Sequence, residues 1–277
     1  KVLGYFCTYM PEEIAYADWV CASIISVQNS LVLTGLLQFG TEEQKQKYLV
    51  PLAKGEKQAS SALTEPAGGT DLARLQTTCR EDGDYYILNG QKNFCSHANH
   101  TNIYLTLATK DKSLGRKGIS CFILENPSPG MTVTPMNMST MKRGNIAEIF
   151  LDDVRVPKEN MLGGEGRGMT VVGANLSMGR FSVASRCVGQ AQARLDAAIK
   201  YANEREIFGH KERDFQMVKQ MIADMTVSVE ATRLLVYRLG CLIDVGVGQL
   251  TSIASMTKFF ASEVCTKVVL DSIQIHG

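Results

Sequence analysis

The chain has 277 residues, 45% of them hydrophobic, which is enough for one or two domains with sizeable cores. Lysine and arginine (29) nearly balance aspartate and glutamate (28), and the formal net charge of +1 provides no overall field that would attract nucleic acid or an anionic membrane. No uninterrupted apolar run of about 18 residues and no signal-peptide pattern stands out, so we expect no membrane span.

The cysteines and histidines predict no metal site. The eight cysteines are scattered without a CxxC pair, and the four histidines add no zinc-ligand spacing. His97 and His100 lie three residues apart in a polar segment, which favours a surface loop over a metal site. Unpaired thiols in a chain of this length are typical of a reducing compartment.

The first fifty residues predict helices. Residues 1–38 form a largely apolar helical run, in which Pro11-Glu12-Glu13 suits a first turn and Gly40 a stop. Thr41 and Gln44 have the spacing of a capping box, so we expect a short helix from Glu42 to Leu52.

A glycine-rich turn follows, with the sequence Ala62-Leu63-Thr64-Glu65-Pro66-Ala67-Gly68-Gly69-Thr70-Asp71. Paired glycines allow positive φ and close approach to the backbone, and bare N–H groups in such a turn form a concave site for an anion such as a pyrophosphate. The threonine hydroxyls on both sides can donate and accept hydrogen bonds. A polar surface turn with nothing bound is the alternative.

From about Ser60 the pattern changes to short strands. Tyr85 to Leu88, Asn89-Gly90 and Gln91 to Ser96 predict a β-hairpin, because Asn-Gly supplies the two positive φ values of a type I′ turn. Further strands are expected in four segments: Ile103–Ala108, Ile119–Leu124, Met131–Thr134 and Ala147–Leu151. Their spacing favours a compact barrel or sandwich.

The second half of the chain is expected to be helical. Gly163 to Gly168 is a weak dinucleotide fingerprint, because no βαβ unit surrounds it, and it indicates a flexible crossing segment. Met169–Ala202 predicts a long helix containing a break. Apolar stripes at helical spacing predict a bundle core; they comprise Met217, Met221, Ile222, Met225 and Val229, and then Ile253, Met256, Phe259, Phe260 and Val264.

Five motifs, in this order and at this spacing, resemble the acyl-CoA dehydrogenase family of flavoproteins over essentially the whole chain. They are Leu63–Asp71, Leu88-Asn89-Gly90-Gln91-Lys92, Asp152-Asp153-Val154-Arg155-Val156-Pro157, Arg205-Glu206-Ile207-Phe208-Gly209 with Phe215-Gln216, and Gln274-Ile275-His276-Gly277. The resemblance implies an α+β chain with a partial helical N-terminal domain (1–59), a middle antiparallel β-barrel (60–158) and a C-terminal helical bundle (159–277). It also implies a homotetramer, and an N-terminal domain and a bundle that are both cut short in this sequence.

The resemblance implies bound FAD. Family positions beside the isoalloxazine ring correspond to Leu63 and Thr64, and those at the phosphate turn to Gly69 and Thr70. Phe94 matches an aromatic position that packs on the ring, commonly Trp, and Ser96 matches a hydroxyl position near N5, commonly Thr. The alternatives are a strand core residue for Phe94 and a satisfied strand serine for Ser96.

In tetrameric relatives a neighbouring subunit grips the adenosine half of FAD, and the matching positions here are Arg205, Phe208, Gln216, Gln274 and Gly277. An arginine there makes charge-assisted bonds to phosphate. The alternative for Arg205 is a helix-end cation interacting with exposed carbonyls.

For the substrate, the resemblance places Ser177 and Arg180 on a helix that contacts the CoA thioester, and Thr70 within reach of the pantetheine arm. A solvated helix arginine is the alternative for Arg180. The catalytic residue is unknown from this sequence. Most relatives carry the catalytic glutamate on a loop that would follow Gly277, and a minority carry it at the position of Gly179, which has no side chain.

The implied reaction is FAD-dependent α,β-dehydrogenation of an acyl-CoA, with electrons passed to an electron-transfer flavoprotein. The alternatives are an enoyl-CoA reductase running the reverse reaction, a flavin oxidase or monooxygenase, and a flavin-binding subunit without a base. The implied location is the bacterial cytoplasm or the mitochondrial matrix. The acyl chain length and the direction of the reaction do not follow from the sequence.

Overall fold

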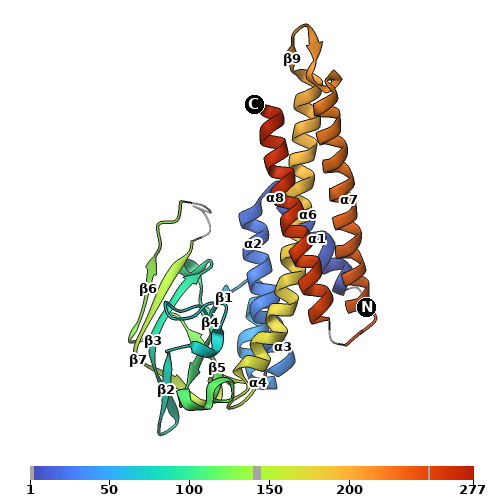
Figure 1. Ribbon diagram of the computed structural model, residues 1–277. Coiled ribbons are helices and arrows are strands. Elements are labelled where there is room, and N and C mark those ends of the chain that lie inside the picture. Colours follow the sequence, from blue (N-terminus) through green and yellow to red (C-terminus); the bar gives the residue numbers. More distant parts are fainter. Residues whose placement is uncertain (1–2, 140–144, 249) are drawn as a thin grey trace. The chain divides into compact units, whose positions relative to one another are not determined.

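The computed structural model describes residues 3–139, 145–248 and 250–277 (Figure 1). The chain forms two compact units, one of residues Val27–Leu176 and one that joins the first 26 residues to Ser177–Gly277. The helices are α1 (Leu3–Ala17), α2 (Trp19–Gln28), α3 (Thr34–Phe39), α4 (Glu42–Gln44), α5 (Val50–Ala53), α6 (Gly168–Glu204), α7 (Gln216–Asp244) and α8 (Thr251–His276). The strands are β1 (Ala59–Ala62), β2 (Thr78–Asp82), β3 (Tyr85–Cys95), β4 (Ile103–Thr109), β5 (Ile119–Glu125), β6 (Met131–Pro135), β7 (Ala147–Pro157), β8 (Met161–Leu162), β9 (Glu206–Ile207) and β10 (His210–Lys211).

The first unit is built on a sheet in the order β6-β7-β3-β2-β4-β5-β8, with β1 paired to β4 (Figure 1). The four strands expected at 103–108, 119–124, 131–134 and 147–151 are confirmed as β4, β5, β6 and the first half of β7. The sheet is mixed, because β1 and β2 both run parallel to β4. Among the described residues no ladder joins β6 to β8, so the expected closed, purely antiparallel barrel is not confirmed. The sequence signals only neighbours joined by short turns, whereas β1 pairs with a strand 44 residues downstream.

The prediction of a hairpin turn at Asn89-Gly90 is wrong. β3 runs through both residues and pairs with β7, with a register shift between Leu88 and Gly90. The glycine is needed for space, because a Cβ at Gly90 would lie 2.8 Å from the Cα of Thr77. The actual hairpin joins β2 to β3 through Gly83, which has φ of 57°.

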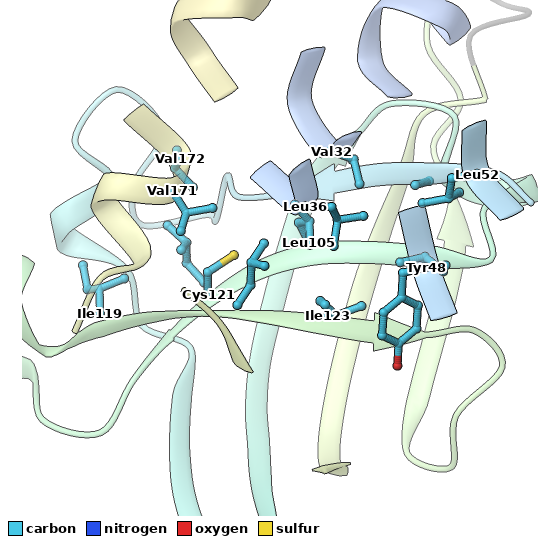
Figure 2. Close-up of a cluster of buried hydrophobic side chains, with 14 of the residues drawn as sticks. Val32, Leu36, Tyr48, Leu52, Leu105, Ile119, Cys121, Ile123, Val171 and Val172 are labelled. Carbon is cyan, nitrogen blue, oxygen red and sulfur yellow. The ribbon is translucent and has the colours of Figure 1, made fainter. Parts of the chain in front are cut away.

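The core of this unit lies on both faces of the sheet. Along β4, residues Ile103, Leu105 and Leu107 belong to one cluster, and Tyr104 and Ala108 belong to the other. This alternation follows from the two-residue period of a strand, and it leaves β4 buried on both sides. Figure 2 shows the first cluster, where helical side chains such as Val32, Leu36 and Val171 meet the strand residues Leu105, Cys121 and Ile123.

The helices before the sheet follow local capping signals. The capping box is confirmed: the Gln44 N–H donates to the Thr41 Oγ1 (3.2 Å) and the Thr41 N–H donates to the Gln44 Oε1 (3.1 Å). Pro11 lies inside α1 rather than in its first turn. The break comes instead at Asp18, whose carboxylate accepts from the N–H groups of Val20 (2.7 Å) and Cys21 (2.9 Å) at the start of α2.

The helical stretch Trp19–Phe39 has a mean hydropathy of 1.7 and is long and apolar enough to cross a membrane, which the sequence analysis did not anticipate. A core helix of a folded protein can have the same length and hydropathy. Val32 and Leu36 are fully buried against the strands of the sheet (Figure 2), and an apolar 18-residue segment of the stretch is 44% buried. The stretch is therefore weak support for a membrane span.

The second unit is a bundle of α1, α6, α7 and α8, with α6 running unbroken over 37 residues (Figure 1). The expected break in this helix is wrong. Part of the predicted core is confirmed, since Met225 and Val229 are buried. Met217, Met256 and Phe259, however, are 81%, 51% and 67% exposed, because no other described element of this unit covers them.

Candidate functional site

The glycine-rich turn has its own hydrogen-bonded frame. The Glu65 N–H donates to the Gly68 carbonyl (2.9 Å), and the Gly68 N–H donates to the Glu65 carbonyl (3.1 Å). Neither Gly68 nor Gly69 adopts the positive φ that a glycine allows. Gly68 is needed for close approach, because a Cβ there would lie 3.0 Å from the Asp71 carbonyl. Among the described residues, the exposed N–H groups of Gly69 and Thr70 have no acceptor within the chain.

A buried ion pair holds this turn against the sheet. The Lys92 Nζ lies 2.6 Å from the Glu65 Oε1 and donates to the Leu107 carbonyl (2.7 Å), and the two side chains are 0% and 2% exposed. The Glu65 carboxylate also accepts from the Thr77 hydroxyl (2.6 Å) and from the Gln76 N–H. The turn is thus fixed by groups that lie 11 to 27 residues away in sequence.

The pKa values of the pair follow from burial and from these contacts. Burial raises the pKa of the Glu65 carboxyl, but the Lys92 ammonium and the hydrogen bonds outweigh it and hold the pKa below its usual value. Burial lowers the pKa of Lys92, and the nearby carboxylate opposes this effect. Lys92 stands in one of the five motifs, but its pairing with Glu65 was not predicted, although the residue is buried like Leu88 on the strand alternation of β3.

Four of the expected flavin residues come together where β1 and β3 end. The Asn93 N–H donates to the Thr64 carbonyl (2.7 Å), and this bond brings Leu63 and Thr64 beside Phe94. The Phe94 side chain is 55% exposed, and its φ of 55° is uncommon for a bulky residue. Ser96 is half-buried, and its carbonyl accepts from the Ser60 hydroxyl (2.6 Å). An exposed aromatic ring therefore stands next to the glycine-rich turn, so Phe94 is not a strand core residue.

The five residues expected to grip adenosine lie at one end of the bundle (Figure 1). Arg205 and Phe208 belong to the β9–β10 hairpin between α6 and α7, and Gln216 is the first residue of α7. The ring of His276, near the end of α8, lies 4.5 Å from that of Tyr201 in the last turn of α6. This contact brings Gln274 and Gly277 to the same end.

These adenosine residues are open to solvent. All five are exposed, and Phe208 is 92% exposed with a φ of 53°. Within the described part of the chain, the Arg205 guanidinium makes no ion pair and no hydrogen bond. The end of the bundle therefore presents an unpaired cation and an exposed ring, which fit a phosphate and a planar base.

The expected substrate residues lie together on α6. Ser177 and Arg180 are half-buried, and Gly179 is buried between them. No carboxylate stands at position 179, so this position provides no base. In the sheet unit, a cavity of about 740 Å³ lies near Phe39, Lys47 and Arg167, and none of the expected site residues line it.

Known proteins resemble this chain throughout its length. Models of the acyl-CoA dehydrogenase N-terminal, middle and C-terminal domains match residues 5–56, 60–154 and 166–277. The caffeyl-CoA reductase-Etf complex subunit CarC of Acetobacterium woodii is 43% identical, over 96% of this chain and 70% of that protein. The 3-(aryl)acrylate reductase of Clostridium sporogenes is 40% identical, over 96% of this chain and 71% of that protein.

The structure of butyryl-CoA dehydrogenase from Megasphaera elsdenii superposes with a TM-score of 0.94 at 39% identity, over 96% of this chain and 70% of that one. The three family models match four of the five motifs in full and Asp152 to Val154 of the remaining one. The chain belongs to the acyl-CoA dehydrogenase family of FAD-dependent oxidoreductases, which act on CH–CH groups with a flavin acceptor.

Proposed function

We propose that the protein interconverts an acyl-CoA and its α,β-unsaturated enoyl-CoA, and exchanges electrons with an electron-transfer flavoprotein. The observation that carries this proposal is the group at the ends of β1 and β3, where the exposed Phe94 follows Asn93, which is bonded to the glycine-rich turn at Thr64. In the same turn, the N–H groups of Gly69 and Thr70 have no acceptor among the described residues. Phe94 is a bulky residue at positive φ and is open to solvent. Backbone strain of this kind is concentrated at functional sites.

These residues suit FAD. Phe94 offers a ring face for the isoalloxazine, Leu63 and Thr64 line its side, and the Ser96 hydroxyl provides a hydrogen bond. The Gly69 and Thr70 N–H groups and the Thr70 hydroxyl can donate to phosphate oxygens. Bound FAD supplies a hydride acceptor, so that the β-hydrogen of the acyl group leaves as hydride while its α-hydrogen leaves as a proton and a C=C bond forms.

The adenosine half is assigned to the exposed end of a bundle from a second copy, through Arg205, Phe208, Gln216, Gln274 and Gly277. A homotetramer, typical of the family, is supported by the large apolar side chains that α7 and α8 leave exposed. They are Val227, Leu234, Met256, Phe259, Leu270 and Ile273.

For the thioester, we assign Ser177 and Arg180 on α6 and Thr70 on the glycine-rich turn. Arg180 makes no ion pair within the described residues, which leaves its guanidinium for a CoA phosphate or carbonyl. The catalytic base is not Gly179. The three matched segments support domain boundaries at 59/60 and 158/159. The proposed location is the bacterial cytoplasm or the mitochondrial matrix.

Reduction of an enoyl-CoA is favoured as the physiological direction by two relatives whose names are reductases, one of them in an Etf complex. Both directions use the same contacts, so the difference lies in the electron partner and in the acyl group.

The test is an anaerobic visible spectrum of the purified protein. Addition of butyryl-CoA or 3-phenylpropionyl-CoA should bleach the flavin bands, and crotonyl-CoA or cinnamoyl-CoA should restore them after reduction with dithionite. CoA alone is the control, and the faster half-reaction indicates the direction. A flavin that dithionite bleaches but that responds to no thioester would refute the proposed reaction and leave the family and the cofactor in place.

A further inference from the structure

Arg186 on α6 is a buried cation that has no counter-ion among the residues that the structure describes. The residue is 6% exposed, and its Nε and Nη1 have no hydrogen-bond partner in the described part of the chain. No described carboxylate lies within ion-pair distance of it. The guanidinium carbon lies 4.4 Å from the ring centroid of Trp19.

This arrangement differs from that of Arg233, which is half-buried in the same bundle. The Arg233 Nε lies 2.8 Å from the Glu12 carboxylate, and its Nη2 donates to the side-chain Oε1 of Gln192 (2.7 Å). A buried charge is normally paired in this way, because an isolated one loses its hydration without compensation. Burial accordingly lowers the pKa of Arg186 to about 10, which still leaves it protonated at neutral pH.

The contact with Trp19 leaves the hydrogen-bonding groups of Arg186 unused. A guanidinium stacks on an aromatic ring through its flat face, whereas its N–H groups point outward in the plane. The Nε–H and Nη1–H groups are therefore donors for which the described residues provide no acceptor. An acceptor from a ligand would satisfy them.

The position of Arg186 on α6 indicates which ligand. Gly179, Ser182 and Arg186 have the i, i+3, i+7 spacing of one helix face. Ser182 is directed toward α2, since its hydroxyl lies 2.7 Å from that of Ser26. Seven residues of helix span about 10 Å, so Arg186 lies about that far along the face from Gly179.

We infer that Arg186 determines acyl-group specificity by binding an oxygen at the end of the acyl group farthest from the thioester. The inference rests on the proposed function, which places the thioester at Ser177 and Arg180. The ligand class is an acyl-CoA that carries a distal hydrogen-bond acceptor. A carboxylate and a phenolic oxygen share this chemistry, and the test below separates them.

The first arm of the test measures thermal unfolding without thioester. Arg186→Met removes an unpaired buried charge and keeps most of the side-chain volume, so its Tm should equal or exceed that of the wild type. Arg233→Met is the matched control on a paired arginine, and its Tm should fall. A fall for Arg186→Met as large as that of the control would give Arg186 a structural role and overturn the inference.

The second arm compares kcat/KM for adipyl-CoA, 3-(4-hydroxyphenyl)propionyl-CoA, and the unsubstituted hexanoyl- and 3-phenylpropionyl-CoA. A hydrogen bond to a charged group corresponds to about a 10- to 100-fold preference. The two comparisons are adipyl-CoA with hexanoyl-CoA, which tests a carboxylate, and 3-(4-hydroxyphenyl)propionyl-CoA with 3-phenylpropionyl-CoA, which tests a phenol. In one of these pairs the wild type should prefer the oxygen-bearing thioester by this factor, and Arg186→Met should lose the preference. Equal ratios in the two proteins would overturn the inference.

Trp19 provides a readout that needs no turnover, because it is the only tryptophan of the chain. The preferred thioester should change its emission in the wild type and not in Arg186→Met, and an unchanged wild-type emission would count against the site. If no thioester bleaches the flavin of the wild type, the proposed function fails and this inference fails with it. If thioesters bleach it but the selectivity ratio does not move, only the inference fails.

Discussion

The Glu65–Lys92 pair permits a quantitative test of what holds the glycine-rich turn. In Lys92→Met the volume is nearly kept, so the effect comes from electrostatics rather than from a cavity. Glu65 keeps its bonds to Thr77 and Gln76 but loses a cation 2.6 Å away, and the Leu107 carbonyl loses its donor. Breaking a fully buried pair costs about 3–5 kcal/mol, and we expect the free energy of unfolding to fall by about 4 kcal/mol.

Urea denaturation at pH 7 measures this change through the midpoint and the m value. Lys110→Met is the matched control in the same unit, because Lys110 pairs with Glu81 and Glu165 at the surface and should lose less than about 1 kcal/mol. The double change Glu65→Gln with Lys92→Met should recover part of the loss, since no unpaired charge remains. A loss below about 1 kcal/mol in Lys92→Met would refute the reasoning.

The pH dependence of the same variant has a definite sign. In the wild type the pKa of Glu65 is held below its usual value of 4.5, so its stabilising contribution is complete above that pH and is lost as the pH falls through the folded-state pKa. Without Lys92, burial acts with less opposition and the pKa of Glu65 moves up. Protonation of Glu65 then removes the unpaired charge. The difference in free energy of unfolding between the wild type and Lys92→Met should therefore be largest near pH 7 and smaller in acid. A difference that grows as the pH falls would contradict a charged Glu65 paired with Lys92.

Three further predictions concern the flavin residues and α6. Arg205→Ala should release FAD and weaken assembly, as checked by flavin absorbance and by sedimentation, and a variant that stays yellow and tetrameric would exclude the proposed grip. Phe94→Gly should relieve about 1 kcal/mol of backbone strain in the protein without flavin and reduce FAD affinity; unchanged affinity would argue against the ring contact. On α6, Gly189→Ala should lower the free energy of unfolding by about 1–3 kcal/mol, because the added Cβ would meet the backbone of Glu12. Gly173→Ala is the control: its added Cβ would have no other atom within 4 Å, so this change should raise the free energy of unfolding by up to about 1 kcal/mol. Chemical denaturation compares the two variants.

Signals that depend on a few adjacent residues predicted the fold well. The capping box at Thr41 and the strand expected at 103–108 follow from contacts within four residues or from a continuous apolar run. The hairpin at Asn89-Gly90 failed because the same dipeptide serves a different purpose. There the glycine makes room for Thr77, which belongs to a segment that local propensity cannot bring alongside.

The residues of the candidate site also fall into those that the sequence identified and those whose role it did not predict. Leu63, Thr64 and Phe94 could be picked out by resemblance, and the structure brings them together through a single backbone bond from Asn93 to Thr64. Lys92 could not be assigned its role, because a lysine in a strand is ordinarily a solvent-facing residue, and only the position of Glu65, 27 residues earlier, makes it a buried partner.

The small residues of α6 show why composition alone misleads. The helix is continuous rather than broken as expected, and Gly168 and Gly189 mark places where the backbone of another segment approaches it. The closest approach is at Gly189, where any side chain would meet the backbone of Glu12 and Tyr16. Ser182 bonds to Ser26 on the same principle of close packing. A large, charged residue among these small ones does not serve close packing, and the described residues supply no counter-ion for Arg186. Both observations favour the ligand contact that we infer for it over a purely structural role.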